Sequence, residues 1–291
     1  MKKYLLSIFM ILMVVLSVSA QQTDTTYWKK AGVAGINMSQ VSLSNWSAGG
    51  DGSIAFDANF TYSFDYNRDK QMWTNRLELA YGLNNTETNG TRKTNDKIYL
   101  ASTYGYKIAK NWYASAFVNF QTQFAKGYNY SVSDEVPISK FMAPGYLSAG
   151  LGFTWTPKTW FKATFSPVTW RGTFILDDAL SDIGAFGVDP GKKFMNEFGA
   201  NIMAEAKFKL MENIGIYSRL DLFSNYLEKP QNIDIKWDIQ VNMKVNKWIS
   251  ANLTLNMIYD DDTKTVKDDG TLGGAKLQFK EVLGVGLQVT F

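Results

Sequence analysis

Two long segments of the chain alternate strictly between apolar and polar residues. From Ser53 to Tyr66 every even-numbered residue is apolar or aromatic, and the odd-numbered ones are small or polar. From Ile233 to Val245 the odd-numbered residues are apolar and the even-numbered ones are charged or amides. A period of two indicates β-strands with two unlike faces. At about thirteen residues these strands exceed the usual five or six and suit tilted strands that cross a membrane.

The same alternation, less regular, recurs along the rest of the chain. It predicts twelve strands, at residues 31–42, 53–66, 72–84, 96–108, 112–124, 146–156, 160–174, 197–210, 214–225, 232–245, 248–259 and 276–291. The connections alternate between short ones, such as 109–111, and long ones, such as 125–145 and 175–196. Tight turns at one end and long loops at the other, with an even strand count, are typical of membrane barrels. The sequence therefore predicts an all-β, twelve-stranded, antiparallel, up-and-down transmembrane barrel.

The N-terminus has the three parts of a secretory signal peptide. Lys2 and Lys3 form a positive start, an apolar run follows, and small residues end at Ala20. The run is short for a transmembrane helix, which needs about 20 residues. We expect residues 1–20 to be a cleaved signal peptide and residues 21–291 to be a single barrel domain.

The composition excludes several kinds of activity. The chain contains no Cys and no His, which excludes disulfides, thiolate or imidazole zinc sites, and His-based hydrolases. Without Lys2 and Lys3 the 30 basic residues fall to 28 against 27 acidic ones, so nothing favours nucleic acid binding. No motif marks Ser–Lys or paired-carboxylate catalysis. We expect no enzyme activity, no cofactor, no metal and no nucleic acid partner.

Six tryptophans fall at one end of the predicted barrel. They begin upward strands or end a downward one: Trp28, Trp73, Trp112, Trp155, Trp160 and Trp248. Amphipathic rings gather where a barrel meets lipid head groups. We interpret them as an aromatic girdle at the periplasmic rim, rather than as core residues of a soluble sheet.

The last predicted strand alternates up to a terminal Phe291. Such an ending resembles the signal read by the outer-membrane insertion machinery, so we expect Phe291 to serve as an insertion signal. Two residues break the pattern of their strands. Glu281 falls on the apolar face, which indicates either a bulge or a position above the lipid, and Pro167 indicates a bulge or the point where its strand leaves the wall.

Charged residues occupy the face predicted to point into the lumen. The candidates are Arg76, Glu78, Glu205, Lys207, Arg219, Asp221, Asp234, Lys236, Asp238, Lys276 and Lys280. One interpretation is a polar channel lining that selects solutes by charge and size. The other is a network of ion pairs that fills a narrow lumen, since twelve strands enclose less space than the 16–18 of open porins.

Two outer loops have unusual compositions. The loop at 175–196 is apolar, so it either folds into the mouth as a constriction, with Phe186 and Val188 as the residues concerned, or packs on its neighbours. It also predicts one helical turn at 177–183 with Ser181 as a cap. The last outer loop carries Asp260, Asp261, Asp262, Asp268 and Asp269. Their spacing is not that of a calcium loop, so we expect a solvated acidic loop.

Several short segments resemble a known family. They are Asn45–Gly50, Phe165–Thr169, Gly184–Val188, Leu220–Tyr226, Pro230–Asp234 and Tyr259–Asp261. The chain resembles a bacteroidete-type family of outer-membrane β-barrel proteins known as a domain of unknown function. The resemblance implies a barrel in the outer membrane of a Gram-negative bacterium and brings no catalytic residues with it. A shared site would lie where the strands meet the outer loops.

Two functions fit the sequence. The first is a narrow outer-membrane channel or transporter for a small polar solute. The alternative is a closed barrel that serves as a non-catalytic scaffold or partner in a surface or secretion assembly. In both, the expected partners are outer-membrane lipid and, during assembly, the insertion machinery.

Overall fold

The computed structural model describes residues 27–43, 51–260 and 273–291. The predicted signal peptide at 1–20 and the segment Asn45–Gly50 lie outside these residues. Twelve antiparallel strands form a closed barrel, as predicted. They are β1 (Trp28–Val41), β2 (Ser53–Arg68), β3 (Gln71–Thr86), β4 (Gly90–Ala109), β5 (Trp112–Thr122), β8 (Gly145–Lys158), β9 (Phe161–Phe174), β10 (Phe194–Met211), β11 (Ile214–Asn225), β12 (Asp234–Lys244), β13 (Ile249–Tyr259) and β14 (Gln278–Thr290).

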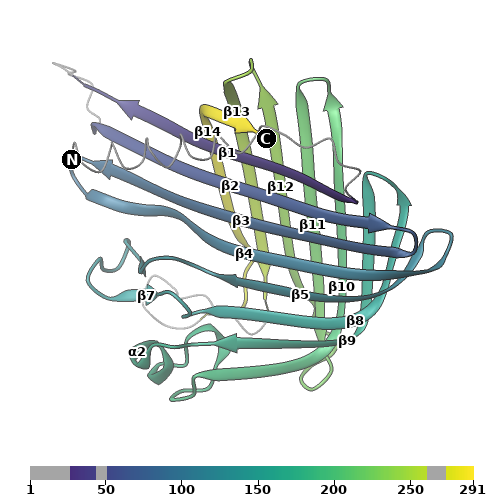
Figure 1. Cartoon of the computed structure of the whole chain (residues 1–291). Coiled ribbons are helices and arrows are strands. Elements are labelled where there is room, and N and C mark those ends of the chain that lie inside the picture. Colours follow the sequence, from purple (N-terminus) through teal and green to yellow (C-terminus); the bar gives the residue numbers. More distant parts are fainter. Residues whose placement is uncertain (1–26, 44–50, 261–272) are drawn as a thin grey trace.

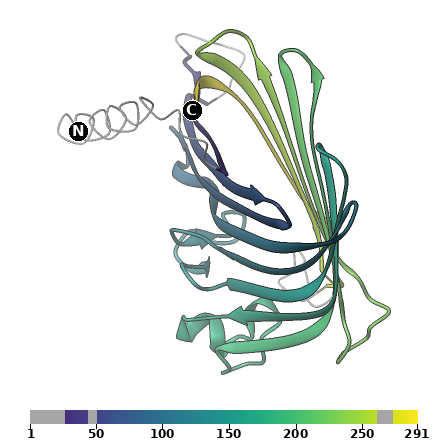
Figure 2. The ribbon, with the colours of Figure 1, turned by 45° about the vertical axis from the view of Figure 1, so that its right-hand side comes forward.

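The strands are strongly tilted. In Figure 1 strands β1 to β5 cross the strands behind them, β10 to β13, at a steep angle. Short turns join the strands at one end, and the longer loops gather at the other end with β6 (Gly127–Tyr128), β7 (Pro137–Ser139), α2 (Asp178–Asp182) and η2 (Ala185–Gly187). The turned view in Figure 2 shows the wall curving around an interior. No helix in the described part of the chain is long and apolar enough to cross a bilayer.

One predicted loop is wrong. The sequence predicts a loop at 85–95, but the rungs between β3 and β4 continue to Thr86 and Gly90 and leave a turn of three residues. A register shift after Gly82 lies within this ladder, and the polar hairpin reaches the level at which β2 begins, since Thr86 pairs with Ser53. The polar Asn and Thr side chains there do not need an apolar partner, because residues 87–91 at the turn are exposed.

A bulge at Pro167 reverses the two faces of β9. Both neighbouring ladders shift their register here, between Gly199 and Asn201 on β10 and between Leu151 and Phe153 on β8. Pro has no N–H to donate, so a bulge is where a strand accommodates it. The inward side chains are even-numbered before Pro167 and odd-numbered after it, and Ser166 and Thr169 are both almost fully buried.

Glu281 lies on the outer face without a bulge. The ladder between β13 and β14 runs without a register shift, and it pairs Glu281 with Leu255. Glu281 follows the alternation of the exposed Leu283 and Val285. Of the two predicted explanations, the bulge is therefore wrong, and Glu281 points outward in the half of β14 nearer the long loops.

The wall has an apolar outer face and a polar inner face. Leu283 and Leu287 on the outside are both 65% exposed, whereas Arg219 inside is 2% exposed. Burial is thus inverted relative to a water-soluble domain, where large apolar side chains lie inside.

The ring closes through its shortest ladder. β1 pairs with β14 over the five rungs from Val33–Thr290 to Asn37–Gly286, and Gly32 and Phe291 add two backbone hydrogen bonds of 2.6 and 2.9 Å. Beyond these rungs, Met38–Val41 pair with β2 alone and residues 278–285 pair within the described chain with β13 alone. The first and last strands therefore diverge toward the long-loop end.

Candidate functional site

The alternation of the strands gathers charged side chains inside the barrel. On β11 and β12 every second residue points inward, which brings Arg219 beside Asp238, its cross-strand partner. The same alternation on β3 and β4 turns Glu78 and Lys97 inward. Because these two pairs of strands lie on opposite sides of the ring, the four side chains face one another across the bore.

These four residues, which we call the central network, span the lumen. The Arg219 guanidinium donates to Asp238 Oδ2 at 2.5 Å, and Lys97 Nζ donates to Glu78 Oε2 at 2.6 Å. Across the bore, Arg219 lies 3.8 Å from Glu78 and Lys97 lies 3.8 Å from Asp238. Arg219 also sits over the Tyr99 ring, 4.1 Å from its centroid. Arg219, Asp238 and Glu78 are at most 4% exposed, so the network fills the lumen at this level.

A second layer extends the network toward the short turns. Arg76 donates to Glu78 at 2.5 Å and, across the bore, to Gln240 at 3.3 Å. Its guanidinium stacks 4.1 Å from the centroid of the Tyr217 ring, and the Tyr217 hydroxyl donates to Glu205 at 2.9 Å. Lys162 forms an ion pair with Glu205. Cation–π, ion-pair and hydrogen-bond contacts therefore link β3 to β9, β10, β11 and β12.

A third cluster lies on the long-loop side. Arg171 makes a bidentate ion pair with Glu197 at 2.5 and 2.6 Å and a further bond to Asp234 at 2.5 Å. Paired, planar contacts of this kind are the strongest geometry available to Arg and a carboxylate. Lys236 reaches Gln121 on the opposite wall. Glu197 is almost fully buried.

A cavity of about 160 Å³ lies between this cluster and the central network. Its lining includes Arg171, Arg219, Asp221, Asp234 and Lys236, so groups from both layers face it. Both positive and negative side chains line it. A small solute that carries both polar donors and acceptors would find partners of either sign there.

The predicted lumen residues fall into three groups. Eight of them point into the lumen in the layers above: Arg76, Glu78, Glu205, Arg219, Asp221, Asp234, Lys236 and Asp238. Lys280 also turns inward and donates to Asn95 at 2.9 Å, while Lys207 is exposed near the short-turn end of β10. Lys276 was expected on the last strand, but β14 begins at Gln278 and Lys276 is exposed before it. The segment 273–277 makes no ladder, so strand parity says nothing about its side chains.

Four charged residues of the site do not follow from the sequence pattern: Lys97, Lys162, Arg171 and Glu197. The Pro167 bulge hides Arg171, because a strand read without the bulge places Arg171 outside. On β4 aromatic residues occur on both faces, with Tyr99 inside and Tyr104 outside, so parity gives no clear inner face. Pro167 itself is the signal that could have found Arg171.

The loop after β9 packs against its neighbours. Val188 is buried with Ala143, Ile175 and Leu180, and Phe186 packs against this cluster. Neither Phe186 nor Val188 is among the residues that line the lumen cavity. The predicted helical turn forms as α2, but its cap is Asp177, which accepts from the Leu180 N–H at 3.1 Å. Ser181 instead donates to the Lys192 carbonyl at 2.6 Å.

Asp177 also anchors this loop electrostatically. It pairs with Lys140 from the preceding loop. The hydrogen bond from the Lys140 ammonium holds the pKa of the Asp177 carboxyl below its usual value of 3.8. Of the predicted acidic loop, Asp260 lies at the end of β13, and the other four aspartates lie outside the described residues.

The six girdle tryptophans lie at the short-turn end. Trp28 lies 5.7 Å from Trp73, and Trp112 lies 6.1 Å from Trp155, measured between ring centroids. Trp160 and Trp248 immediately precede β9 and β13. Phe291 packs beside Gly32, against the rings of Phe60 and Tyr62 at 6.4 and 6.3 Å. Its role in insertion stays a prediction.

Chemically, the lumen offers ion pairs and hydrogen bonds. In the described ranges no three His, Cys, Asp or Glu side chains are grouped to hold a metal ion. Each inward charge in the central network is engaged by an opposite charge, so the arrangement suits binding of a polar solute and closure of the lumen.

Comparison with known proteins gives one family and several solved structures. No curated protein matches the chain in sequence. Among solved structures, the chain is similar to the COG4313 outer membrane channel from Pseudomonas putida F1, with 11% identity and a TM-score of 0.40 over 93% of this chain and 100% of that one. It is similar to the NanC porin, with 9% identity and a TM-score of 0.40 over 88% and 98%. It is also similar to the translocator domain of autotransporter NalP from Neisseria meningitidis, with 8% identity and a TM-score of 0.34 over 98% and 95%. Residues 38–128 match the family described as "Protein of unknown function (DUF3078)", which confirms the resemblance to a family of unknown function over this part of the chain.

Proposed function

We propose that the protein is an integral outer-membrane barrel that acts as a gated channel for small polar solutes and is closed in this conformation. The central network carries the proposal, because it joins opposite walls of the bore through Lys97–Asp238 and Arg219–Glu78 contacts of 3.8 Å. An open diffusion pore would leave this space to water.

The wall supports a membrane location. Its apolar outer face would be unfavourable in water, and its closed ladder satisfies backbone groups that lipid cannot. Short turns at one end and long loops at the other correspond to the periplasmic and outer sides of bacterial barrels. The Trp-rich end would then lie at the periplasmic interface, one of the two membrane interfaces where aromatic girdles form.

The cavity supports a solute-binding role. It lies on the outer side of the central network and shares Arg219 with it. A solute with an anionic group could pair with Arg171, Arg219 or Lys236 and compete for their present partners. Selectivity filters built from charged side chains work by this kind of exchange. Binding in the cavity would thereby weaken the contacts that close the bore.

Planar-bilayer conductance of the purified protein tests the proposal. The double variant Arg219→Ala/Glu78→Ala removes one charge of each sign and both ends of one cross-bore contact. We expect rare openings for the unmodified protein and frequent, discrete steps for the double variant. The control Lys29→Gln/Lys247→Gln, at the short-turn rim, should behave like the unmodified protein. Silence of the double variant in a barrel that remains heat-modifiable and membrane-bound would overturn the channel.

A closed, non-catalytic scaffold is the second candidate. The apolar packing of the loop around Val188 favours it, because a fixed loop offers a stable surface on the outer side. A barrel that stays silent with and without the central network would support this function. Recovery of the protein as a soluble periplasmic monomer would contradict both candidates.

A further inference from the structure

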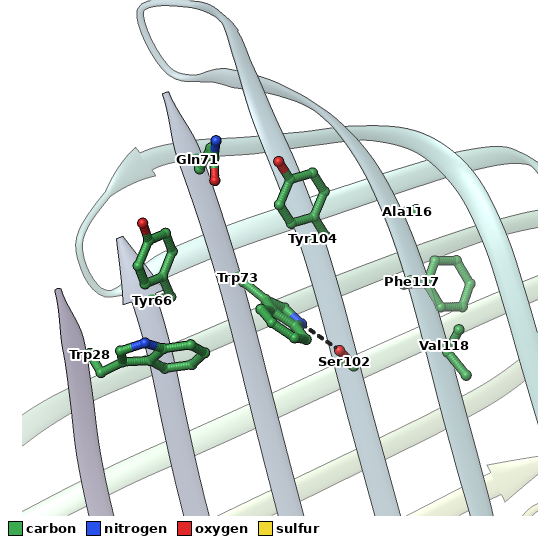
Figure 3. Close-up of a pocket in the computed structure, with 9 residues that line it drawn as sticks. All are labelled: Trp28, Tyr66, Gln71, Trp73, Ser102, Tyr104, Ala116, Phe117 and Val118. Carbon is green, nitrogen blue, oxygen red and sulfur yellow. Dashed lines mark hydrogen bonds between the residues drawn. The ribbon is translucent and has the colours of Figure 1, made fainter. Parts of the chain in front are cut away.

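The outer face carries a groove near the short-turn end. It has a volume of about 570 Å³, and its lining includes Trp28, Tyr66, Trp73, Tyr104 and Ala116. Figure 3 shows the four aromatic rings spread over neighbouring strands, with Ala116, Phe117 and Val118 beyond them. Apart from Phe117, which is buried, these residues belong to the outward faces of β1 to β5, so the groove opens away from the lumen.

The groove arises from one row of cross-strand partners. Trp28 pairs with Tyr66, Tyr66 with Trp73, Trp73 with Tyr104, and Tyr104 with Ala116. Aromatic residues therefore run along the row until a methyl group replaces a ring on β5. In the adjoining row Ser102 is again a small side chain. The two small residues leave a depression that the surrounding rings border.

Hydrogen bonds hold one wall of the groove in place. The Trp73 indole N–H donates to Ser102 Oγ at 2.8 Å, as Figure 3 shows, and Ser102 Oγ donates to Asn75 Oδ1 at 2.8 Å. The Asn75 amide donates in turn to the Phe64 carbonyl at 3.0 Å. Trp28 lies 5.2 Å from Tyr66, centroid to centroid. The polar groups of Trp73, Ser102 and Asn75 are thus engaged with one another or with the backbone, and apart from Gln71 the open surface is aromatic and aliphatic.

Basic residues border the groove on the side of the turns. Arg68 and Lys70 flank Asp69 between β2 and β3, and Lys110 lies in the turn between β4 and β5. Lys30 lies on the same outer face of β1 as Trp28 but farther from the turns, opposite Phe64. Asp69 is the acidic residue of these two turns, and it lies 3.5 Å from Arg68. All four basic side chains are exposed. The margin of the groove is therefore positive, next to an apolar floor.

We infer that this groove binds one anionic glycerophospholipid of the periplasmic leaflet. An acyl chain would lie along Ala116 and Val118 between the rings, and the phosphate would lie beside Lys70 and Arg68. Long basic side chains reach the head-group level while their stems stay against apolar surface. The inference rests on the proposed membrane location and on the assignment of the short turns to the periplasm, but it is independent of whether the bore conducts.

Native mass spectrometry of the purified barrel tests this inference. The protein in detergent is titrated with phosphatidylglycerol and with phosphatidylcholine of the same acyl chains, and with glycerol phosphate as a chainless anion. We expect one preferred phosphatidylglycerol per barrel and no comparable binding of glycerol phosphate. Arg68→Gln/Lys70→Gln should weaken phosphatidylglycerol about twenty-five-fold, since each basic residue at a membrane surface is worth about fivefold, and should leave phosphatidylcholine unchanged.

Two matched variants locate the site. Ala116→Phe fills the depression and should weaken both phospholipids, whereas Lys244→Gln/Lys247→Gln removes the same charge from the turn between β12 and β13 and should weaken neither. Equal phosphatidylglycerol affinity in all variants, or an equal loss in the Lys244/Lys247 control, would overturn the groove as a specific site. Heat-modifiable migration of each variant shows whether the barrel is intact, so loss of the lipid site is distinguished from loss of the membrane barrel.

Discussion

Trp237 and Asp238 are neighbours on β12, yet Trp237 is 40% exposed on the outer face and Asp238 is 2% exposed on the inner face. In a water-soluble protein the ring would be buried and the carboxylate hydrated. In lipid the outer face gains little from apolar partners, while a charge on the inner face depends on its opposite charge. Different substitutions should therefore destabilise the barrel at the two faces. On the outer face the damaging change is a gained charge, and on the inner face it is a lost one.

The largest expected effect is on the inner face. Arg219→Met takes from Asp238 its partner at 2.5 Å and from Glu78 a cation at 3.8 Å. Lys97 remains as the cation that the two carboxylates still share. Breaking a buried pair in this way costs about 3–5 kcal/mol of the free energy of unfolding. Urea unfolding in detergent micelles measures it. Lys29→Met, an exposed residue at the rim, is the control and should change stability by less than about 0.5 kcal/mol. Equal stability of the two variants would mean that the ion pairs of the central network do not contribute to the free energy of unfolding.

The outer face should respond next most strongly. Ile239→Arg places a charge on the lipid side and should destabilise the barrel by about 2–4 kcal/mol near the midplane. Gln240→Glu places a charge on the inner side, where Arg76 lies 3.3 Å from the Gln240 side chain, and should cost less than about 1 kcal/mol. Unfolding in lipid vesicles compares them. A larger loss for Gln240→Glu would reverse our assignment of the two faces.

A contact within the outer face should matter less than a charge placed on it. Phe291→Ala removes two aromatic contacts, with Phe60 and Tyr62, and should cost about 1 kcal/mol. Leu287→Ala, on the same face and 65% exposed, should cost less. The two unfolding curves in vesicles provide the measurement. Indistinguishable curves would show that ring packing adds nothing at this lipid-facing position.

The smallest effect concerns the loop outside the wall. Asp177→Ala removes the cap of α2 and the Lys140 pair and should open this loop locally at a cost of about 1 kcal/mol, whereas Asp177→Asn keeps a capping oxygen. Because its pKa is lowered in the folded loop, the Asp177 contact stabilises the loop above pH 3.8 and is lost as the pH falls through the lowered pKa. Limited proteolysis of the loop measures both. Equal cleavage of Asp177→Ala and the unmodified protein would show that α2 needs no cap.

The strands follow from the sequence because their two faces meet different surroundings. Where the contrast between the faces is strong, as at 53–66, the prediction agrees with β2 almost residue for residue. It fails at 85–95, because every residue of this segment is polar or Gly, so the hairpin has no apolar face to mark it. The sequence also gives no sign of β6 and β7, which are two and three residues long.

The arrangement of side chains in the lumen can be predicted from the sequence only in part. Alternation places Glu78, Arg219 and Asp238 on the inner face, but it cannot show that opposite walls touch. Contacts such as Lys97–Asp238 depend on strand tilt and on the shape of the closed ring, which are properties of all twelve strands together. The bulge at Pro167 shows a further limit, since one inserted residue turns Arg171 to the inner face, opposite to the face that uninterrupted alternation would give it.

The short ladder between β1 and β14 has a consequence for assembly. Its partners, such as Val33 and Thr290, are separated by nearly the whole chain, whereas the other ladders of the barrel join strands that follow one another along the chain. Closing so large a loop brings the greatest loss of chain entropy, and five rungs repay little of it. We expect this seam to form last as the protein folds. Its backbone amides should also be the first in the wall to exchange with solvent deuterium, because the ring reopens where it is joined by the fewest bonds.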